Sequence, residues 1–135
     1  MTVELHKLRA HELMKTEIQW ASANDNLRTA GERMAQHGLR ALLVRGEDPA
    51  DLPGIVTNKD IVNLLGSHDP AVLDQLRVGD VMTRPAICVA PQANVRDCIN
   101  LMRMSGIRRM PVVEGTSVVG VISTSDIFAR AMRRE

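Results

Sequence analysis

Residues 54–60 read Gly-Ile-Val-Thr-Asn-Lys-Asp, and residues 120–126 read Gly-Val-Ile-Ser-Thr-Ser-Asp. Both stretches place two β-branched residues after a glycine, then a hydroxyl residue, and then an aspartate three positions later. β-Branched residues favour strands. A Ser or Thr followed three residues later by an acidic side chain is typical of a capping box at a helix N-terminus. Both stretches therefore predict a strand that leads directly into a helix.

The two stretches belong to a longer internal repeat. At an offset of 68 residues, residues 14–44 align with residues 82–112 and share seven identities over 31 ungapped positions. The offset falls to 66 after residues 46–53, where the first copy has a longer turn. The identical pairs before this turn are Met14/Met82, Asn26/Asn94, Arg28/Arg96, Met34/Met102, Gly38/Gly106, Arg40/Arg108 and Val44/Val112. A repeat of this length indicates two copies of one supersecondary unit.

Each copy predicts the element order β-α-β-β-α, and hence an α+β fold class. The expected extended segments and strands are 19–21, 41–44 and 55–57 in the first copy, and 87–89, 110–113 and 118–123 in the second. Helices are expected over 27–37 and 95–105, where apolar residues recur on one face, and again from Asp60 and Asp126. Gly38 and Gly106 follow the first helices, where a C-terminal cap favours a left-handed residue.

The same pattern predicts the domain organisation. We expect an N-terminal helical extension over 1–9, a first repeat over 10–69, a linker over 70–77 that is compatible with a helix, and a second repeat over 78–135.

Composition and charge narrow the classes of protein to consider. The chain is 44% hydrophobic and 24% charged, with a formal net charge of +1. A net charge this small gives no general attraction to nucleic acid or to an anionic membrane. No apolar run approaches the roughly 20 residues that span a bilayer, and the N-terminus lacks the apolar stretch of a secretory signal. We expect a cytoplasmic protein that requires no cofactor to fold.

The reactive side chains give little sign of chemistry. Cys88 and Cys98 are predicted to be buried thiols rather than a disulfide, and the apolar helix face around Cys98 favours a core role over a redox role. No phosphate-binding glycine loop, catalytic carboxylate pair or nucleophile motif stands out, so no catalytic residue is predicted. The four histidines are scattered and predict no metal site: His6, His11, His37 and His68.

The pairs Thr57/Asp60 and Ser123/Asp126 have two compatible interpretations. As capping boxes, they would satisfy the first N–H groups of a helix, and the carboxylate would complement the helix dipole. As ligand groups, they would lie at a helix N-terminus, which suits phosphate, with a carboxylate that can accept hydrogen bonds from ribose hydroxyls. The residues alone leave both interpretations open.

Three motifs in the second copy carry a resemblance to a known family. They are Asp-Val-Met-Thr-Arg-Pro at 80–85, Ile-Arg-Arg-Met-Pro-Val-Val at 107–113, and the stretch at 120–126. Repeated in tandem and in this order, they make residues 10–133 resemble the CBS (cystathionine β-synthase) domain family. The resemblance implies a pseudo-twofold CBS-domain pair with two clefts, which in that family often bind AMP, ADP, ATP, NAD or S-adenosylmethionine.

The resemblance also implies roles for particular residues. Asp60 and Asp126 would hold ribose, with Thr57 and Ser123 near ribose or phosphate. Two arginines would face phosphates, and three residues at the start of the second repeat would line the adenine: Arg108 and Arg109, and Pro85, Ala86 and Ile87. The other implied ligand-binding residues are Ile18, Arg40, Met110 and Pro111.

The first repeat departs from the family pattern. It has Glu17 opposite Pro85, Ala41 opposite Arg109, and a single basic residue, Arg40. We therefore expect the second repeat to form the better site for a phosphate-bearing ligand, because it keeps five residues together: Pro85, Arg108, Arg109, Ser123 and Asp126. Near the first site, Trp20 is a candidate to stack a base, although a lone Trp in a strand is more often part of the core.

Three functions are compatible with these features. The first is a regulatory module that senses an adenine nucleotide and acts through a homodimer or an unidentified protein partner. The second is a ligand-free dimerisation scaffold in which the aspartates are only helix caps. The third, an enzyme, lacks an evident base or metal site. Retention of both aspartates and of the arginine pair favours the sensor. We expect a homodimer, to which the segment 2–15 could contribute by packing.

Overall fold

The computed structural model describes residues 4–133. The first three residues of the predicted N-terminal extension and the last two of the predicted second repeat, Arg134 and Glu135, lie outside this range. The chain divides into two compact units. We call Gln19–Ala86 the Asp60 unit, and the described parts of Met1–Ile18 and Ile87–Glu135 the Asp126 unit. Each unit is described by itself.

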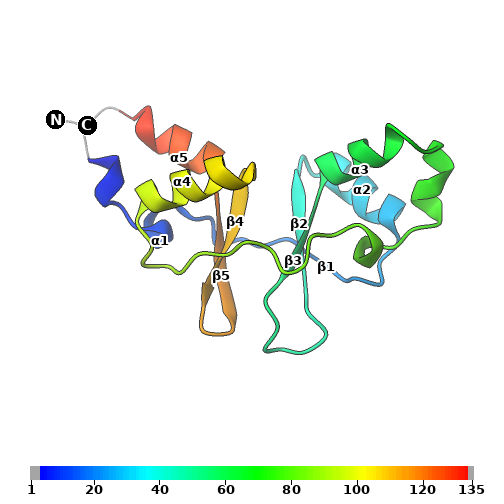
Figure 1. The fold of residues 1–135 in the computed structure, drawn as a ribbon, viewed down its shortest axis with the longest axis horizontal. Coiled ribbons are helices and arrows are strands. Elements are labelled where there is room, and N and C mark those ends of the chain that lie inside the picture. The colour runs from blue at the N-terminus through cyan, green and yellow to red at the C-terminus, as the bar shows by residue number, and fades with distance from the viewer. Residues whose placement is uncertain (1–3, 134–135) are drawn as a thin grey trace. The chain divides into compact units, whose positions relative to one another are not determined.

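The Asp60 unit has a three-stranded sheet with two main helices (Figure 1). Its strands are β1 (Trp20–Ala21), β2 (Ala41–Val44) and β3 (Gly54–Thr57). Strand β2 lies in the centre, parallel to β1 and antiparallel to β3. The helical elements are α2 (Leu27–Gln36), α3 (Asn58–Leu65), and the 3₁₀ helices η2 (Pro70–Asp74) and η3 (Val78–Asp80).

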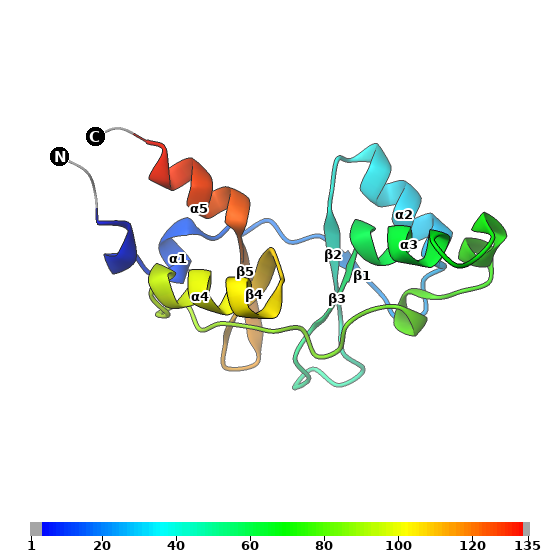
Figure 2. The same ribbon diagram turned by 45° about the horizontal axis from the view of Figure 1, so that its top comes forward.

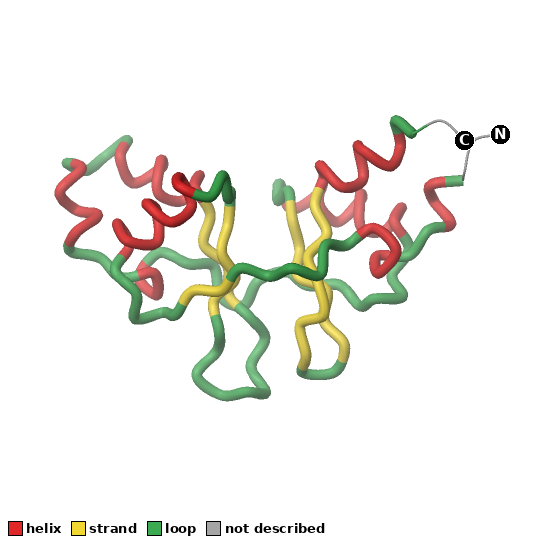
Figure 3. Tube along the Cα trace, turned by 180° about the vertical axis from the view of Figure 1, so that it is seen from behind, coloured by secondary structure: helices red, strands yellow, loops and turns green. Residues whose placement is uncertain are grey.

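The Asp126 unit has an antiparallel hairpin in place of the sheet, with helices on one side of it (Figure 3). The hairpin strands are β4 (Arg109–Glu114) and β5 (Ser117–Ser123). The helical elements are η1 (Leu5–Lys7), α1 (Ala10–Leu13), α4 (Val95–Ser105) and α5 (Thr124–Ala131). The described part of the N-terminal extension packs on the core of this unit.

The predicted strand at 87–89 is reduced to one bridge, between Val89 and Val112. In the Asp60 unit, the Leu43 N–H donates to the Gln19 carbonyl at 3.0 Å and helps to hold β1 on β2. The residue equivalent to Leu43 is Pro111, which has no N–H to donate to Ile87. The second copy therefore lacks the hydrogen bond that would extend this pairing by another residue.

The ends of the main helices are fixed by residues next to them in the sequence. The side chains of Asn26 and Asn94 cap α2 and α4 by accepting hydrogen bonds from backbone N–H groups three residues later. Gly38 and Gly106 follow these helices with φ of 63° and 73°, which confirms the predicted left-handed caps. The helices α3 and α5 begin two residues before the predicted starts, with Asp60 and Asp126 in their first turns.

Each unit has its own apolar core, and the two cores use equivalent positions. Seven core residues of the Asp60 unit are Leu27, Ala30, Met34, Leu42, Val44, Val56 and Val78. Their equivalents in the Asp126 unit are Val95, Cys98, Met102, Met110, Val112, Ile122 and Ala10. Burial and the charge of Asp97 raise the pKa of Cys98, and its core role is confirmed. Cys88 is only half-buried, so the prediction that it is buried is wrong.

Each unit is completed by the opening segment of the opposite repeat. We call residues 8–18 and 76–86 the leading segments. Lys15 exchanges both backbone hydrogen bonds with Val121 of β5, each 2.9 Å long. Thr83 exchanges both with Ile55 of β3, at 2.9 and 3.0 Å. The segment that opens the first repeat is thus hydrogen-bonded to a strand of the second repeat. The segment that opens the second repeat is hydrogen-bonded to a strand of the first.

The packing of each leading segment on the opposite repeat explains the glycine at the start of residues 54–60 and 120–126. A Cβ atom at Gly120 would lie 2.5 Å from the Met14 sulfur and 2.9 Å from the Lys15 carbonyl oxygen. At Gly54 it would lie 3.1 Å from the Met82 sulfur. Gly120 therefore leaves room for Met14, and Gly54 leaves room for Met82. In each pair, the glycine and the methionine come from different repeats.

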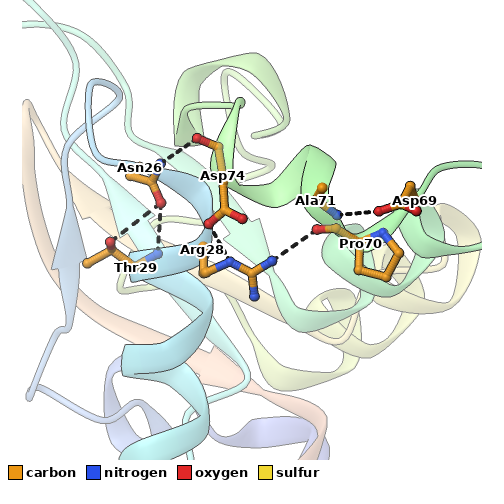
Figure 4. Close-up of polar contacts among 7 residues, drawn as sticks. All are labelled: Asn26, Arg28, Thr29, Asp69, Pro70, Ala71 and Asp74. Carbon is orange, nitrogen blue, oxygen red and sulfur yellow. Dashed lines mark hydrogen bonds and ion pairs between the residues drawn. The ribbon is translucent and has the colours of Figure 1, made fainter.

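The predicted linker forms the 3₁₀ helix η2, which docks on α2 in the Asp60 unit (Figures 2 and 4). The Arg28 guanidinium pairs with the Asp74 carboxylate and donates to the Pro70 carbonyl at 3.0 Å. The Asn26 amide donates to the Asp74 carbonyl at 3.1 Å. The hydrogen bond and the charge of Asp74 raise the pKa of Arg28.

Candidate functional site

The predicted site residues Thr57 and Asp60 lie where β3 ends and α3 begins. The Thr57 N–H donates to Asp60 Oδ2 at 2.8 Å, and the Asp60 N–H donates to Thr57 Oγ1 at 3.2 Å. At the equivalent start of α5, the distances between Ser123 and Asp126 are 2.9 and 3.2 Å. Both capping boxes are confirmed.

One carboxylate oxygen of Asp126 is left for a partner outside the capping box. Its Oδ1 atom lies 3.5 Å from the Lys15 ammonium nitrogen, while its Oδ2 atom also accepts from the Ser123 hydroxyl at 2.8 Å. The Asp126 side chain is 9% exposed and the Lys15 side chain 75%. The site therefore combines a nearly buried anion with a cation that water and ligands can reach.

Lys15 is not among the site residues predicted from the sequence. Its equivalent in the repeat is Thr83, which has no charge and pairs with Ile55 in the Asp60 unit. The leading segments thus supply a cation beside Asp126 and a neutral hydroxyl residue to the unit of Asp60. The alignment of the repeats shows that Lys15 and Thr83 differ in charge. Only the packing of residues 8–18 on the second repeat brings Lys15 close to Asp126.

The predicted arginines lie on the strand next to each helix start. Arg109 is the cross-strand partner of Ser123, and the Arg108 carbonyl accepts from the Thr124 N–H at 2.8 Å. In the Asp60 unit, Ala41 takes the place of Arg109 and pairs with Thr57. The backbone around Arg40 repeats that of Arg108, because the Arg40 carbonyl accepts from the Asn58 N–H at 2.9 Å.

The predicted adenine-lining residues divide between the units. Pro85 and Ala86 belong to the Asp60 unit, where the Ala86 N–H donates to the Pro53 carbonyl at 2.9 Å. Pro85 lies with Asp126 in the second repeat by sequence, while its backbone belongs to the Asp60 unit. The Arg84–Pro85 peptide bond is cis. Ala86 is 5% exposed, which leaves little of its side chain for a ligand.

The remaining predicted residues belong to the Asp126 unit and differ in accessibility. Ile87 is exposed and Ile18 is half-buried, so both have surface to offer a ligand. Met110 and Pro111 are fully buried, and Met110 lies in the core. Their placement argues against ligand contacts by these two side chains.

Trp20 already has a cation on its ring. The guanidinium carbon of Arg45 lies 4.1 Å from the ring centroid, in cation–π geometry. The Arg33 side chain donates to the Trp20 carbonyl. Trp20 is half-buried in β1. A base that stacked on the same face of the ring would have to displace Arg45.

Two further features bear on the class of site. Within residues 4–133, no group of three His, Cys, Asp or Glu side chains is placed to hold a metal ion. In the same part of the chain, no helix has the length and apolar character needed to cross a membrane.

Comparisons with known proteins agree with this architecture. The uncharacterized protein YlbB of Bacillus subtilis (strain 168) is 30% identical over 116 residues, which cover 86% of this chain and 77% of that protein. A hexameric CBS-CP12 protein from bloom-forming cyanobacteria has a TM-score of 0.82 at 32% identity, covering 93% of this chain and 72% of that one.

A third comparison is with the CBS domain pair of protein MJ0100, solved in complex with 5′-methylthioadenosine and S-adenosyl-L-methionine. It shares the fold, with a TM-score of 0.77 at 22% identity over 90% of this chain and 98% of that one. The family model of the CBS domain matches residues 10–67 and 78–133. The chain therefore belongs to the CBS-domain family and carries a CBS-domain pair, a regulatory, ligand-binding module.

Proposed function

We propose that the chain is a regulatory module that binds a phosphate-bearing adenine nucleotide beside Asp126, and that it acts through a homodimer or a protein partner. The observation that carries the proposal is the pairing of a nearly buried Asp126 carboxylate with the Lys15 ammonium group at 3.5 Å. A carboxylate can accept hydrogen bonds from ribose hydroxyls. The adjacent cation and the N-terminus of α5 both favour a phosphate group.

The charges around the two helix starts support a phosphate in one unit more than in the other. The Asp126 unit offers Lys15, Arg108 and Arg109, whereas the Asp60 unit offers Arg40 and, in the first turn of α3, Lys59. Lys15 beside the carboxylate, together with two arginines where the neighbouring strand β4 begins, favours AMP, ADP, ATP or NAD. S-Adenosylmethionine has a sulfonium cation and no phosphate, so it suits the less basic Asp60 site better. The complex of MJ0100 supports an adenosyl ligand in this fold.

Binding at this site would link the two repeats. Lys15 lies in the opening segment of the first repeat, whereas Asp126 lies in the second repeat. A ligand that contacts both residues stabilises the arrangement in which the leading segment stays on β5. It can shift the protein only to the extent that it binds this arrangement more tightly than others. This differential affinity is the proposed source of regulation.

A thermal shift screen tests the proposal. The candidates are AMP, ADP, ATP, NAD and S-adenosylmethionine, with GMP and ribose 5-phosphate as controls. A ligand at about 100 times its dissociation constant adds roughly 2.7 kcal/mol of stability. For a chain of this length, the melting temperature should rise by several degrees. If no adenine compound at millimolar concentration shifts the melt, nucleotide sensing is rejected.

The alternative is a structural dimerisation module, and one observation favours it. Both capping boxes are complete without a ligand, since each hydroxyl and one oxygen of each aspartate already have backbone partners. In this alternative, the aspartates act only on helix stability. Self-association in the absence of nucleotide, together with a negative screen, supports the alternative.

A further inference from the structure

The two leading segments are held in their units by matching backbone hydrogen bonds. The Ala10 N–H donates to the Ala93 carbonyl at 2.8 Å, and the equivalent Val78 N–H donates to the Asp25 carbonyl at the same distance. The strand pairings of the two segments also correspond, with bonds of 2.9–3.0 Å in both units. A difference in how firmly the segments are attached must therefore come from their side chains.

A side-chain clamp lies upstream of one segment and lacks its key residue in the other. In the Asp60 unit, Arg28 of α2 pairs with Asp74 of η2 and so joins the two elements (Figure 4). At the repeat offset of 68, the equivalent residues are Arg96 of α4 and His6 of η1. His6 has no carboxylate to offer Arg96. The clamp of the Asp60 unit is therefore not repeated in the Asp126 unit.

Two further contacts favour weaker attachment in the Asp126 unit. The ion pair beside His6 joins Lys7 to Glu4 at 2.8 Å, within η1 and its N-cap, so it does not tie η1 to α4. In the core, Ala10 takes the fully buried position that Val78 takes in the Asp60 unit. Alanine removes less apolar surface from water than valine does, so it contributes less to holding the segment in place.

Lys15 gives this weaker segment a contact that a ligand can reinforce. Its ammonium nitrogen lies 3.5 Å from Asp126 Oδ1, and its side chain is 75% exposed. A nucleotide whose ribose is held by Asp126 and whose phosphate contacts Lys15 would join the segment to α5. Thr83, the equivalent of Lys15, has no charge to attract a phosphate. The proposed ligand therefore acts on the segment that is less firmly attached.

We propose that residues 5–18, which we call the latch, open and close on β5 while the rest of the Asp126 unit stays folded, and that the bound nucleotide holds the latch closed. Local opening of this kind is expected where few contacts hold a segment. Opening leaves the N–H and the carbonyl of Val121 without their partners and exposes an edge of β5. The nucleotide control rests on the proposed function, whereas the separate opening of the latch does not.

Hydrogen exchange of matched backbone amides tests the latch. Lys15 and Val121 each donate to the other's carbonyl, as Thr83 and Ile55 do in the Asp60 unit. Without nucleotide, NMR should show Lys15 and Val121 exchanging at least about tenfold faster than Thr83, Ile55 and the hairpin residue Ile122, after correction for intrinsic rates. Equal rates at Lys15, Val121 and Ile122 would mean that exchange requires unfolding of the whole unit, and would overturn the latch.

Adding AMP distinguishes the latch from the proposed function. Saturating AMP should slow exchange at Lys15 and Val121 by about two- to fivefold, because an exposed ion pair supplies a differential affinity of this size. Thr83 and Ile55 should be unaffected. AMP binding without slowing would overturn the nucleotide control and leave the proposed function intact. Absence of AMP binding would count against the proposed function and would overturn the nucleotide control with it, while fast exchange at Lys15 and Val121 would still support separate opening.

Restoring the clamp provides a second test with a matched control. His6→Asp gives Arg96 the carboxylate that Arg28 has, and it should slow exchange of the two latch amides by about two- to fivefold without nucleotide. His6→Asn has nearly the same shape without the charge and should leave their exchange unchanged. Equal slowing in both variants, or slowing in neither, would contradict the role of the missing clamp in latch opening.

Discussion

The starts of α3 and α5 are nearly identical in backbone geometry and different in charge. The capping bonds of Thr57 with Asp60 and of Ser123 with Asp126 differ by at most 0.1 Å in length. Yet a lysine from a leading segment lies beside Asp126, whereas the equivalent residue in the Asp60 unit is a threonine. The comparison shows that the same capping bonds hold the carboxylate in both units, whereas the residues next to it give the two sites different charge.

Neutralising each carboxylate in turn should have the largest effect on the difference between the two sites. Asp126→Asn keeps the size of the side chain and an oxygen for the cap, but it removes the charge that accepts ribose hydroxyls. Hydrogen bonds to charged groups contribute roughly 1.5–3 kcal/mol, so the affinity for AMP should fall about 10- to 100-fold in calorimetric titrations. Asp60→Asn should leave it nearly unchanged. Equal losses in both variants would refute the proposed difference between the sites.

The second prediction concerns the glycines where the leading segments cross. Gly120→Ala forces a Cβ atom within 2.9 Å of the Lys15 carbonyl oxygen, whereas at Gly54 the equivalent distance to the Thr83 carbonyl oxygen is 3.1 Å. Overpacking of this kind costs roughly 1–3 kcal/mol. We expect Gly120→Ala to lower the melting temperature more than Gly54→Ala. The opposite order in urea or thermal unfolding would contradict the observed packing of the leading segments.

The third prediction exchanges the residues that distinguish the two sites. Lys15→Thr gives the Asp126 site the residue of the other unit. Because Lys15 is largely exposed, the loss should resemble that of a surface ion pair, about 0.2–1 kcal/mol. AMP affinity should fall by up to about fivefold and become less sensitive to salt, while adenosine affinity should stay the same. A similar loss for adenosine would show that Lys15 acts on the fold and not on phosphate.

The matched control for this exchange is Thr83→Lys. It should leave AMP binding at Asp126 unchanged, since Thr83 belongs to the Asp60 unit. It should add a second, weaker phosphate site. If Thr83→Lys alone reduced binding to the same extent as Lys15→Thr, the assignment of Lys15 to the Asp126 site would be wrong.

The local features of the fold could be predicted from the sequence because their causes lie within a few residues. The capping boxes at Thr57 and Ser123 and the left-handed glycines at 38 and 106 need no distant partner. The strand at 87–89 was overpredicted, because Pro111 lies far from it in the sequence and cannot donate the next hydrogen bond.

The candidate site was harder to predict, because its residues come from both repeats. Pro85 shares the second repeat with Asp126 by sequence, but its backbone lies in the Asp60 unit. For the same reason, Lys15 was not considered. A repeat identifies which residues are equivalent, but it does not say which copy each segment packs on. That depends on long-range contacts, such as the exchange of hydrogen bonds between Lys15 and Val121.

The most direct test of the account is to locate AMP by NMR, using ¹H–¹⁵N spectra of the wild-type protein during a titration. We expect the amide signals of residues 123–126 and of Lys15 to shift and to saturate together, because these N–H groups belong to the proposed phosphate and ribose site. The signals of residues 57–60 should remain in place at the same AMP concentrations. Saturating shifts at residues 57–60, with none at residues 123–126, would contradict the account.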